Sequence, residues 1–234
     1  MQSYIDKSES YFSHARREIA ALLPQHCGRV LEIGCGSGAT LGWLRQNKRT
    51  SRTVGVEIAE AAAMAARFNV DEVHCLDFEH AELPDETANF DVILCLDVLE
   101  HMVNPWGAVD RLVNRYLAPG GVLVVSLPNV RHYSVVLPLL FRGRWTYENA
   151  GLLDRTHLRF FTRQTAFELL AHDQLEAVQD KDAKPEWRTR KGVFNSLTGG
   201  IFCDLLTYQY CLAARKRAVV HHDTPSPVNC PGAG

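Results

Sequence analysis

Short apolar runs alternate with stretches that have apolar residues at helical spacing over the first 130 residues of the chain. Five apolar runs predict buried strands, at 29–33, 53–58, 73–78, 90–99 and 122–128. The helical spacing predicts helices at 11–23, 40–46, 59–68 and 106–117. Apolar strands that alternate with helices are typical of a mostly parallel sheet that is covered on both faces. The pattern therefore predicts an α/β fold.

The pattern changes after Pro128. Residues 129–161 are rich in arginine, histidine and aromatic side chains and follow no simple period. We expect this segment to cover the carboxyl ends of the strands, where ligands bind in such sheets. Three further elements are predicted, namely a helix at 162–173 and strands at 175–181 and 207–216. The tail, 217–234, has little to bury and is expected to be disordered, so residues 1–216 are predicted to form one domain.

Composition and charge narrow the classes of function. The chain has 25 Lys and Arg against 27 Asp and Glu, whereas a dedicated nucleic-acid binder usually has a clear basic excess. Residues 131–191 carry 11 basic and 8 acidic side chains, which favours an anionic acceptor in that region. The seven cysteines include no C-x-x-C pair, as is typical of reduced thiols in a cytoplasmic protein. We expect no signal peptide, because the first residues, MQSYIDKSESYF, have no apolar core. We expect no membrane span either, because the longest apolar run, 135–141, is too short.

Glycines occupy alternate positions directly after the first predicted strand. Gly34, Gly36 and Gly38 lie between this strand and the next helix, where glycine lets the backbone turn sharply and approach a ligand. Glu57 ends the second predicted strand, and a carboxylate there can accept hydrogen bonds from ribose hydroxyls. The pattern has two interpretations, because Gly34-x-Gly36-x-x-Ala39 also satisfies a dinucleotide-binding fingerprint.

Three further motifs separate these interpretations. Glu32 precedes the first glycine by two residues, Asp77 and Phe78 end the third predicted strand, and the fourth runs as FDVILCLDVLEH into a helix. Together with the glycine loop, these motifs resemble the class I S-adenosylmethionine-dependent methyltransferases. The resemblance covers roughly residues 11–130 as the cofactor half. It implies a Rossmann-like seven-stranded sheet, mostly parallel, with helices on both faces and an antiparallel last strand at 207–216.

The resemblance implies S-adenosylmethionine as the cofactor. In that family the glycine loop lies under the methionine part, and Glu57 would hold both ribose hydroxyls. Asp77 would accept a hydrogen bond from the adenine amino group, and the backbone at Leu96 would accept one from the methionine ammonium. Arg16 would lie near the methionine carboxylate, while Tyr11 would help to close the site. The implied cofactor residues are Tyr11, Arg16, Glu32, Gly34, Gly36, Gly38, Glu57, Ile58, Asp77, Phe78 and Leu96.

The second half resembles bacterial methyltransferases of glycan and secondary-metabolite pathways, most distinctively in the stretch LDRTHLRFFT. It implies methyl transfer to a small-molecule or glycan-linked acceptor, with a hydroxyl oxygen as the expected target. A hydroxyl must lose a proton, and the candidate bases are His157 and His101. The candidate acceptor-binding residues are Arg131, His132, Tyr133, Trp145, Asp154 and Arg155. No cluster of carboxylates and histidines is apparent in the sequence that would argue for a metal site.

Alternatives stay open for the function and for single residues. A nicotinamide-dependent dehydrogenase would usually carry a Tyr-x-x-x-Lys pair, and the sequence contains none. A cofactor-binding module without catalysis would keep the glycine loop and lack turnover. His157 could be a structural residue that is hydrogen-bonded within its loop, and the six arginines between 131 and 163 could form surface ion pairs. The sequence does not specify the oligomeric state.

Overall fold

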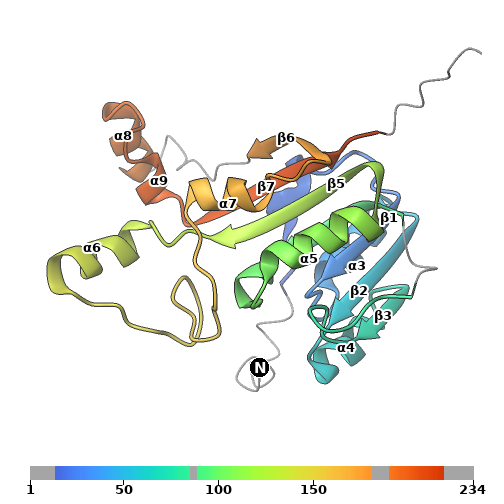
Figure 1. The fold of residues 1–234 in the computed structure, drawn as a ribbon. Helices are drawn as coiled ribbons and strands as arrows, with labels where there is room; N and C mark the ends of the chain where they lie inside the picture. The colour runs from blue at the N-terminus through green and yellow to red at the C-terminus, as the bar shows by residue number, and fades with distance from the viewer. Residues whose placement is uncertain (1–13, 85–88, 181–189, 219–234) are drawn as a thin grey trace, which may run out of the picture.

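A seven-stranded sheet forms the centre of the computed structural model, which describes residues 14–84, 89–180 and 190–218 (Figure 1). The strands lie in the order β3-β2-β1-β4-β5-β7-β6. The first five strands of the chain are parallel, and β7 pairs antiparallel with both β5 and β6. Their bounds are β1 (Arg29–Ile33), β2 (Arg52–Glu57), β3 (Glu72–Cys75), β4 (Phe90–Leu96), β5 (Leu117–Pro128), β6 (Leu175–Asp180) and β7 (Gln209–Lys216). The predicted mostly parallel sheet with an antiparallel last strand is confirmed.

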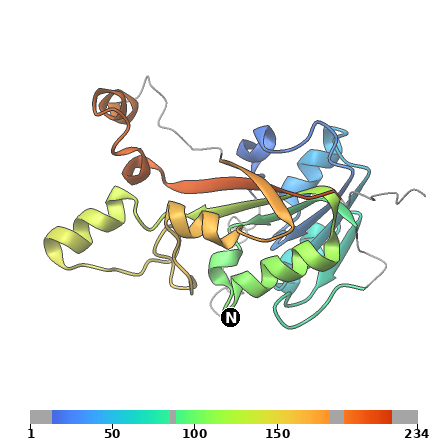
Figure 2. The same cartoon turned by 45° about the horizontal axis from the view of Figure 1, so that its top comes forward.

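Helices cover both faces of the sheet (Figure 1, Figure 2). Val92 and Leu94 of β4 pack into one hydrophobic cluster and Ile93 and Cys95 into another, because successive side chains of a strand point to opposite faces. The first cluster includes residues of η1, α3 and α4, and the second includes residues of α5 and α7. The bounds are η1 (Arg17–Ala21), α3 (Ala39–Gln46), α4 (Glu60–Ala66), η3 (Leu99–His101), α5 (Pro105–Arg111), η4 (Leu112–Tyr116), α6 (Tyr133–Arg142), α7 (Arg163–Leu169), α8 (Arg190–Leu197) and α9 (Cys203–Leu206). Among the described residues, none of the helices has the length and apolar character needed to cross a membrane.

The helix predicted at 11–23 is wrong over the part that the structure describes. A five-residue 3-10 helix, η1, forms there instead. Pro24 lacks an N–H group and disfavours helical backbone at the residue before it, so the short apolar stretch does not extend into an α-helix. Tyr11 and residues 219–234 of the predicted tail lie outside the described residues.

Three observed boundaries differ from the predicted ones. Two strands end earlier than predicted, each before a polar residue, and one predicted helix changes type before its end. β3 ends three residues early, because Asp77 accepts a hydrogen bond of 2.9 Å from the Glu79 amide within a turn. β4 also ends three residues early, since Asp97 has a φ of +55°, which lies outside the extended region. The helix predicted at 106–117 is α-helical to Arg111 and continues as the π-helical turn η4, after which β5 begins.

Residues 129–161 contain a helix, α6, that the sequence pattern did not predict. Its side chains Leu140 and Phe141 are 69% and 76% exposed, so its apolar residues do not follow the period that burial imposes on a helix. Pro138 also lies inside α6, although proline usually marks a helix end. The short helices α8 and α9 were missed as well. In Figure 1, α6 extends away from the sheet beyond the end of β5.

The burial of β4 gives a test of the fold. Leu94 is fully buried in this central strand, so Leu94→Ala should lower the free energy of unfolding by about 2–5 kcal/mol. Leu140→Ala removes the same atoms from an exposed side chain and should change it by less than about 0.5 kcal/mol. Urea denaturation followed by circular dichroism measures both variants. Equal losses in the two would contradict this arrangement.

Candidate active site

Two cavities open at the carboxyl ends of the parallel strands, and Gly34 lies on the wall of both. The first, of about 410 Å³, is bounded by the ends of β2 and β3, by η3 and by part of the segment 155–158. The second, of about 400 Å³, is bounded by the glycine loop and the end of β4. Nine of the eleven predicted cofactor residues line them, with Gly34, Glu57, Ile58, Asp77 and Phe78 on the first cavity and Arg16, Glu32, Gly34, Gly36 and Leu96 on the second. Gly38 lines neither cavity, and Tyr11 lies outside the described residues.

Left-handed backbone makes the loop depend on glycine. Gly34, Gly36 and Gly38 have φ angles of +72°, +54° and +73°, which L side chains rarely adopt. A Cβ atom on Gly34 would also lie 2.8 Å from a methyl carbon of Val98. The Gly34 amide donates a hydrogen bond of 2.8 Å to the carbonyl of Val56. The loop is therefore held against the end of β2, while Gly38 lies just before α3 as its N-cap.

The Glu57 carboxylate binds the glycine loop directly. One of its oxygens accepts from the Gly36 amide and the other from the Ala59 amide, each at 2.9 Å. Glu57 is 1% exposed, and this burial raises the pKa of its carboxyl group, while the two backbone amides act in the opposite direction. An ionised carboxylate offers about four acceptor positions. The group therefore keeps capacity for further donors at the edge of the first cavity.

Glu32 is a second buried carboxyl group at this sheet edge. It lies in β1 and is 3% exposed. Burial raises its pKa to about 8, against the lowering effects of the Arg16 guanidinium and of a hydrogen bond with Thr40. Among the described residues its Oε2 atom has no hydrogen-bond partner. Burial therefore favours the protonated form of this group in the folded protein.

Arg16 reaches across the second cavity to the end of β4. Its guanidinium forms an ion pair with Asp97 and donates a hydrogen bond of 2.7 Å to Gln209. Ser126 donates a hydrogen bond of 2.9 Å to Asp97, which fixes the carboxylate. The sequence analysis missed Asp97 and Gln209. Asp97 could have been found as the polar residue that ends an apolar strand, whereas nothing in the sequence singles out Gln209.

Ile58, Asp77 and Phe78, which the sequence analysis assigned to the adenine, line the first cavity together. Asp77 also accepts a hydrogen bond of 2.8 Å from the ring of His80, so its carboxylate is oriented by its own turn. Phe78 is 3% exposed, and the Arg111 guanidinium lies 4.3 Å from its ring centroid. Phe78 thus joins the cavity wall to the hydrophobic core.

One of the six acceptor candidates, Arg155, lines the first of these two cavities. The others make contacts elsewhere. Arg131 forms an ion pair of 2.8 Å with Asp204. The buried ring of His132 caps the start of α6 by accepting a hydrogen bond from the Ser134 amide. Both of these side chains have structural contacts that the sequence did not reveal.

The remaining acceptor candidates pack within the segment 129–161. Tyr133 lies with its ring centroid 4.3 Å from that of the preceding histidine. Trp145 packs edge-on against Phe160 at 5.2 Å between centroids. Asp154 is buried and accepts hydrogen bonds of 2.9 and 2.7 Å from the amide and hydroxyl of Thr156. This carboxylate therefore orders the turn that precedes His157.

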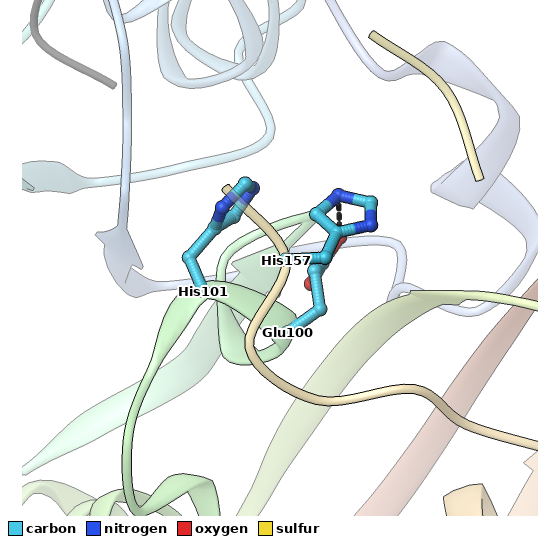
Figure 3. Close-up of side chains that lie close together, drawn as sticks. All are labelled: Glu100, His101 and His157. Carbon is cyan, nitrogen blue, oxygen red and sulfur yellow. Dashed lines mark ion pairs between the residues drawn. The ribbon is translucent and has the colours of Figure 1, made fainter. Parts of the chain in front are cut away.

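The two candidate bases lie side by side beside the first cavity, together with Glu100 (Figure 3). The ring centroids of His101 and His157 are 4.8 Å apart. The Nε2 atom of His157 lies 3.9 Å from a Glu100 oxygen, and burial raises the pKa of Glu100 to about 8. His101 lines the cavity, whereas His157 does not line it and is 8% exposed. Sequence reasoning did not include Glu100 in this cluster.

Comparison with known proteins identifies the family. A family model described as a methyltransferase domain matches residues 8–180. The chain belongs to this methyltransferase family. The ubiquinone biosynthesis O-methyltransferase of Azoarcus sp. (strain BH72) is 29% identical over 164 residues, which cover 62% of this chain and 68% of that protein. A probable S-adenosylmethionine-dependent methyltransferase of Mycolicibacterium smegmatis is 33% identical over 123 residues, which cover 52% of this chain and 47% of that protein.

Solved structures give the same fold for the methyltransferase. An S-adenosylmethionine-dependent methyltransferase from Archaeoglobus fulgidus superposes with a TM-score of 0.63 at 17% identity, covering 92% of this chain and 97% of that one. One from Mesorhizobium loti has a TM-score of 0.59 at 17% identity, with coverage of 91% and 100%. The family decides between the two interpretations of the glycine loop. The protein is an enzyme of the class I type, and its cofactor is S-adenosylmethionine.

The pKa of Glu32 predicts a pH dependence of stability. Because this pKa is raised to about 8 from 4.5, the folded state holds a proton that the unfolded state has lost, and stability falls as pH rises through 8. Glu32→Gln keeps a neutral side chain at every pH. Relative to this variant, the unmodified protein should lose on the order of 1 kcal/mol or more between about pH 5 and about pH 8.5.

Denaturation midpoints at several pH values measure this difference. Glu60→Gln is the matched control, because Glu60 is exposed and the change should leave the pH profile of the unmodified protein intact. Parallel profiles for the unmodified protein and Glu32→Gln would contradict the raised pKa.

Proposed function

We propose that the enzyme transfers the methyl group of S-adenosylmethionine to a hydroxyl oxygen of a small-molecule acceptor. The oxygen target is supported by the similarity to the O-methyltransferase of Azoarcus, which is 29% identical. The observation that carries the proposal is the position of Gly34 between two cavities, with the Glu100, His101 and His157 side chains beside one of them. Arg155 lies on the cavity wall, and its guanidinium suits a carboxylate or phosphate. This side chain favours an anionic or glycan-linked acceptor within the same proposal.

In this proposal the adenosine part of the cofactor binds in the first cavity. Glu57 accepts hydrogen bonds from the ribose hydroxyls with the positions that its two amide contacts leave over. Asp77 accepts one from the adenine amino group, and Ile58 and Phe78 pack on the ring. The methionine part then binds in the second cavity, where its carboxylate meets Arg16 and its ammonium meets the end of β4.

Methyl transfer from a sulfonium is an in-line displacement, so the protein has to align the acceptor oxygen and exclude water. The oxygen attacks the methyl carbon as the carbon–sulfur bond breaks, and the hydroxyl proton must leave. We assign the removal of this proton to the side of the first cavity where His101 lies, with His157 and Glu100 behind it. This placement puts His101 on the cavity side of the cluster and His157 in a supporting position.

The cofactor assignment is tested by Glu57→Gln. A glutamine side chain has one carbonyl oxygen, so it can accept from the Gly36 amide or the Ala59 amide but leaves the other buried donor unpaired. We expect the affinity for S-adenosylmethionine and for S-adenosylhomocysteine to fall at least about tenfold, about 1.4 kcal/mol. Calorimetric titration measures both ligands and NAD, and Glu60→Gln is the control. Binding of NAD alone by the unmodified protein would overturn the proposal.

Turnover is tested by the formation of S-adenosylhomocysteine with chosen acceptors. Catechol and simple phenols probe a free small-molecule hydroxyl, and a nucleotide-linked sugar probes a glycan-linked one. We expect product with the first group, and methylation of oxygen is read from the mass and the nuclear magnetic resonance shift of the product. Tight binding of S-adenosylmethionine without turnover of any acceptor would instead favour a non-catalytic binding module.

A further inference from the structure

The cluster of Glu100, His101 and His157 brings three metal-ligating side chains to one point (Figure 3). One ligand atom from each residue lies within 4.8 Å of those of the other two. Glu100 is 1% exposed and His157 is 8% exposed. Buried groups of this kind are paired or coordinate a metal, because isolated burial of a charge is costly. Exposure to solvent therefore does not explain why these polar side chains lie together.

Both imidazole rings are oriented by backbone carbonyls. The Nδ1 atom of His101 lies 3.1 Å from the carbonyl oxygen of Thr156, and that of His157 lies 3.2 Å from the carbonyl oxygen of Leu152. A carbonyl oxygen only accepts hydrogen bonds, so each Nδ1 atom must donate. In each neutral ring the Nε2 atom then carries the lone pair. Histidines that bind a metal through one ring nitrogen usually donate the N–H of the other to such an acceptor.

Glu100 supplies a carboxyl group with unused binding capacity. Its Oε2 atom is buried and has no hydrogen-bond partner among the described residues. Its Oε1 atom lies 3.9 Å from Nε2 of His157, which is too far for a hydrogen bond. Two ligands that each lie about 2.1 Å from one ion are roughly 3.4 Å apart in tetrahedral geometry. The two atoms need to approach by about 0.5 Å to share an ion, and the three ligand atoms, which lie within 4.8 Å of one another, need to approach by up to about 1.4 Å.

We propose that Glu100, His101 and His157 bind one divalent transition-metal ion, for which Zn²⁺ is the best-suited species. Two imidazoles and one carboxylate form the donor set of catalytic zinc sites that keep an open coordination position. Imidazole donors favour zinc and its neighbours over Mg²⁺, which prefers oxygen ligands. His101 lies on the wall of the first cavity, so the open position faces a space that a further ligand can enter.

The role of the ion rests on the proposed function. The open position would take the hydroxyl oxygen of the acceptor, whose pKa falls on binding to the ion. The hydroxyl proton then goes to water, the oxygen forms a bond to the methyl carbon, and the carbon–sulfur bond breaks. The sulfonium of the cofactor becomes a neutral thioether. In this role the two histidines hold the ion and do not take the proton themselves.

Direct titration of metal-free protein tests the site. Protein that has been treated with a chelator is titrated with ZnCl₂, CoCl₂ and MgCl₂ by calorimetry, and Co²⁺ is also followed by its visible absorption. We expect one Zn²⁺ or Co²⁺ per chain at micromolar or tighter affinity, and at least about 100-fold weaker binding of Mg²⁺. His101→Ala should weaken Zn²⁺ binding at least about 100-fold. Glu100→Gln should weaken it as well, while circular dichroism verifies that each variant is folded.

A matched control lies elsewhere on the chain. His172 faces Asp110 at 3.3 Å, so His172→Ala removes a histidine beside a carboxylate without touching the cluster and should leave Zn²⁺ binding unchanged. Equal Zn²⁺ affinity in the unmodified protein, His101→Ala and Glu100→Gln would overturn the site. S-adenosylhomocysteine is titrated into the same samples. A protein that binds Zn²⁺ but not this ligand would contradict the proposed function and leave the metal site standing.

Discussion

The contact between the Glu57 carboxylate and two backbone amides determines the shape of the cofactor region. Glu57 ends β2, and its oxygens hold the Gly36 amide of the glycine loop and the Ala59 amide before α4. The loop can take this path only because its glycines accept positive φ angles. The wall between the two cavities, formed at Gly34, follows from that path. One buried side chain at the end of β2 thus connects the loop that follows β1 with the start of α4.

Three buried carboxyl groups, Glu32, Glu57 and Glu100, gather near the same sheet edge and have pKa values that burial raises. Such groups weaken a fold unless donors compensate them, and the compensation differs between the three. Glu57 receives two amides, while Glu32 and Glu100 each retain an oxygen without a partner among the described residues. Buried polar groups left in this state are typical of sites that trade stability for function. All three carboxyl groups lie near the two cavities where the ligands of a methyltransferase are expected.

The elements whose residues are buried in the core could be predicted from the sequence. Strands such as β4 are apolar throughout because both faces are covered, and this pattern gave the sheet. The α6 helix was not predicted, because apolar residues such as Leu140 are exposed and its apolar positions do not follow a helical period. The cofactor residues carry motifs at fixed spacing, and two cavities collect most of them. The acceptor residues carry no such spacing, and Arg131 and His132 turned out to have structural partners.

The cluster of Glu100, His101 and His157 could not be predicted from the spacing of residues along the sequence. Hydrogen bonds between segments that are distant in the sequence bring its members together. The amides of Leu158 and Arg159 donate to the Glu100 carbonyl at 2.8 and 3.0 Å, and the Thr156 carbonyl accepts from His101. The segment that carries Arg155 is therefore bound to η3, the short helix that follows β4 and carries Glu100 and His101. Arg155 and Leu158 also line the cavity. The wall of the first cavity and the orientation of the His101 ring therefore depend on the same short segment.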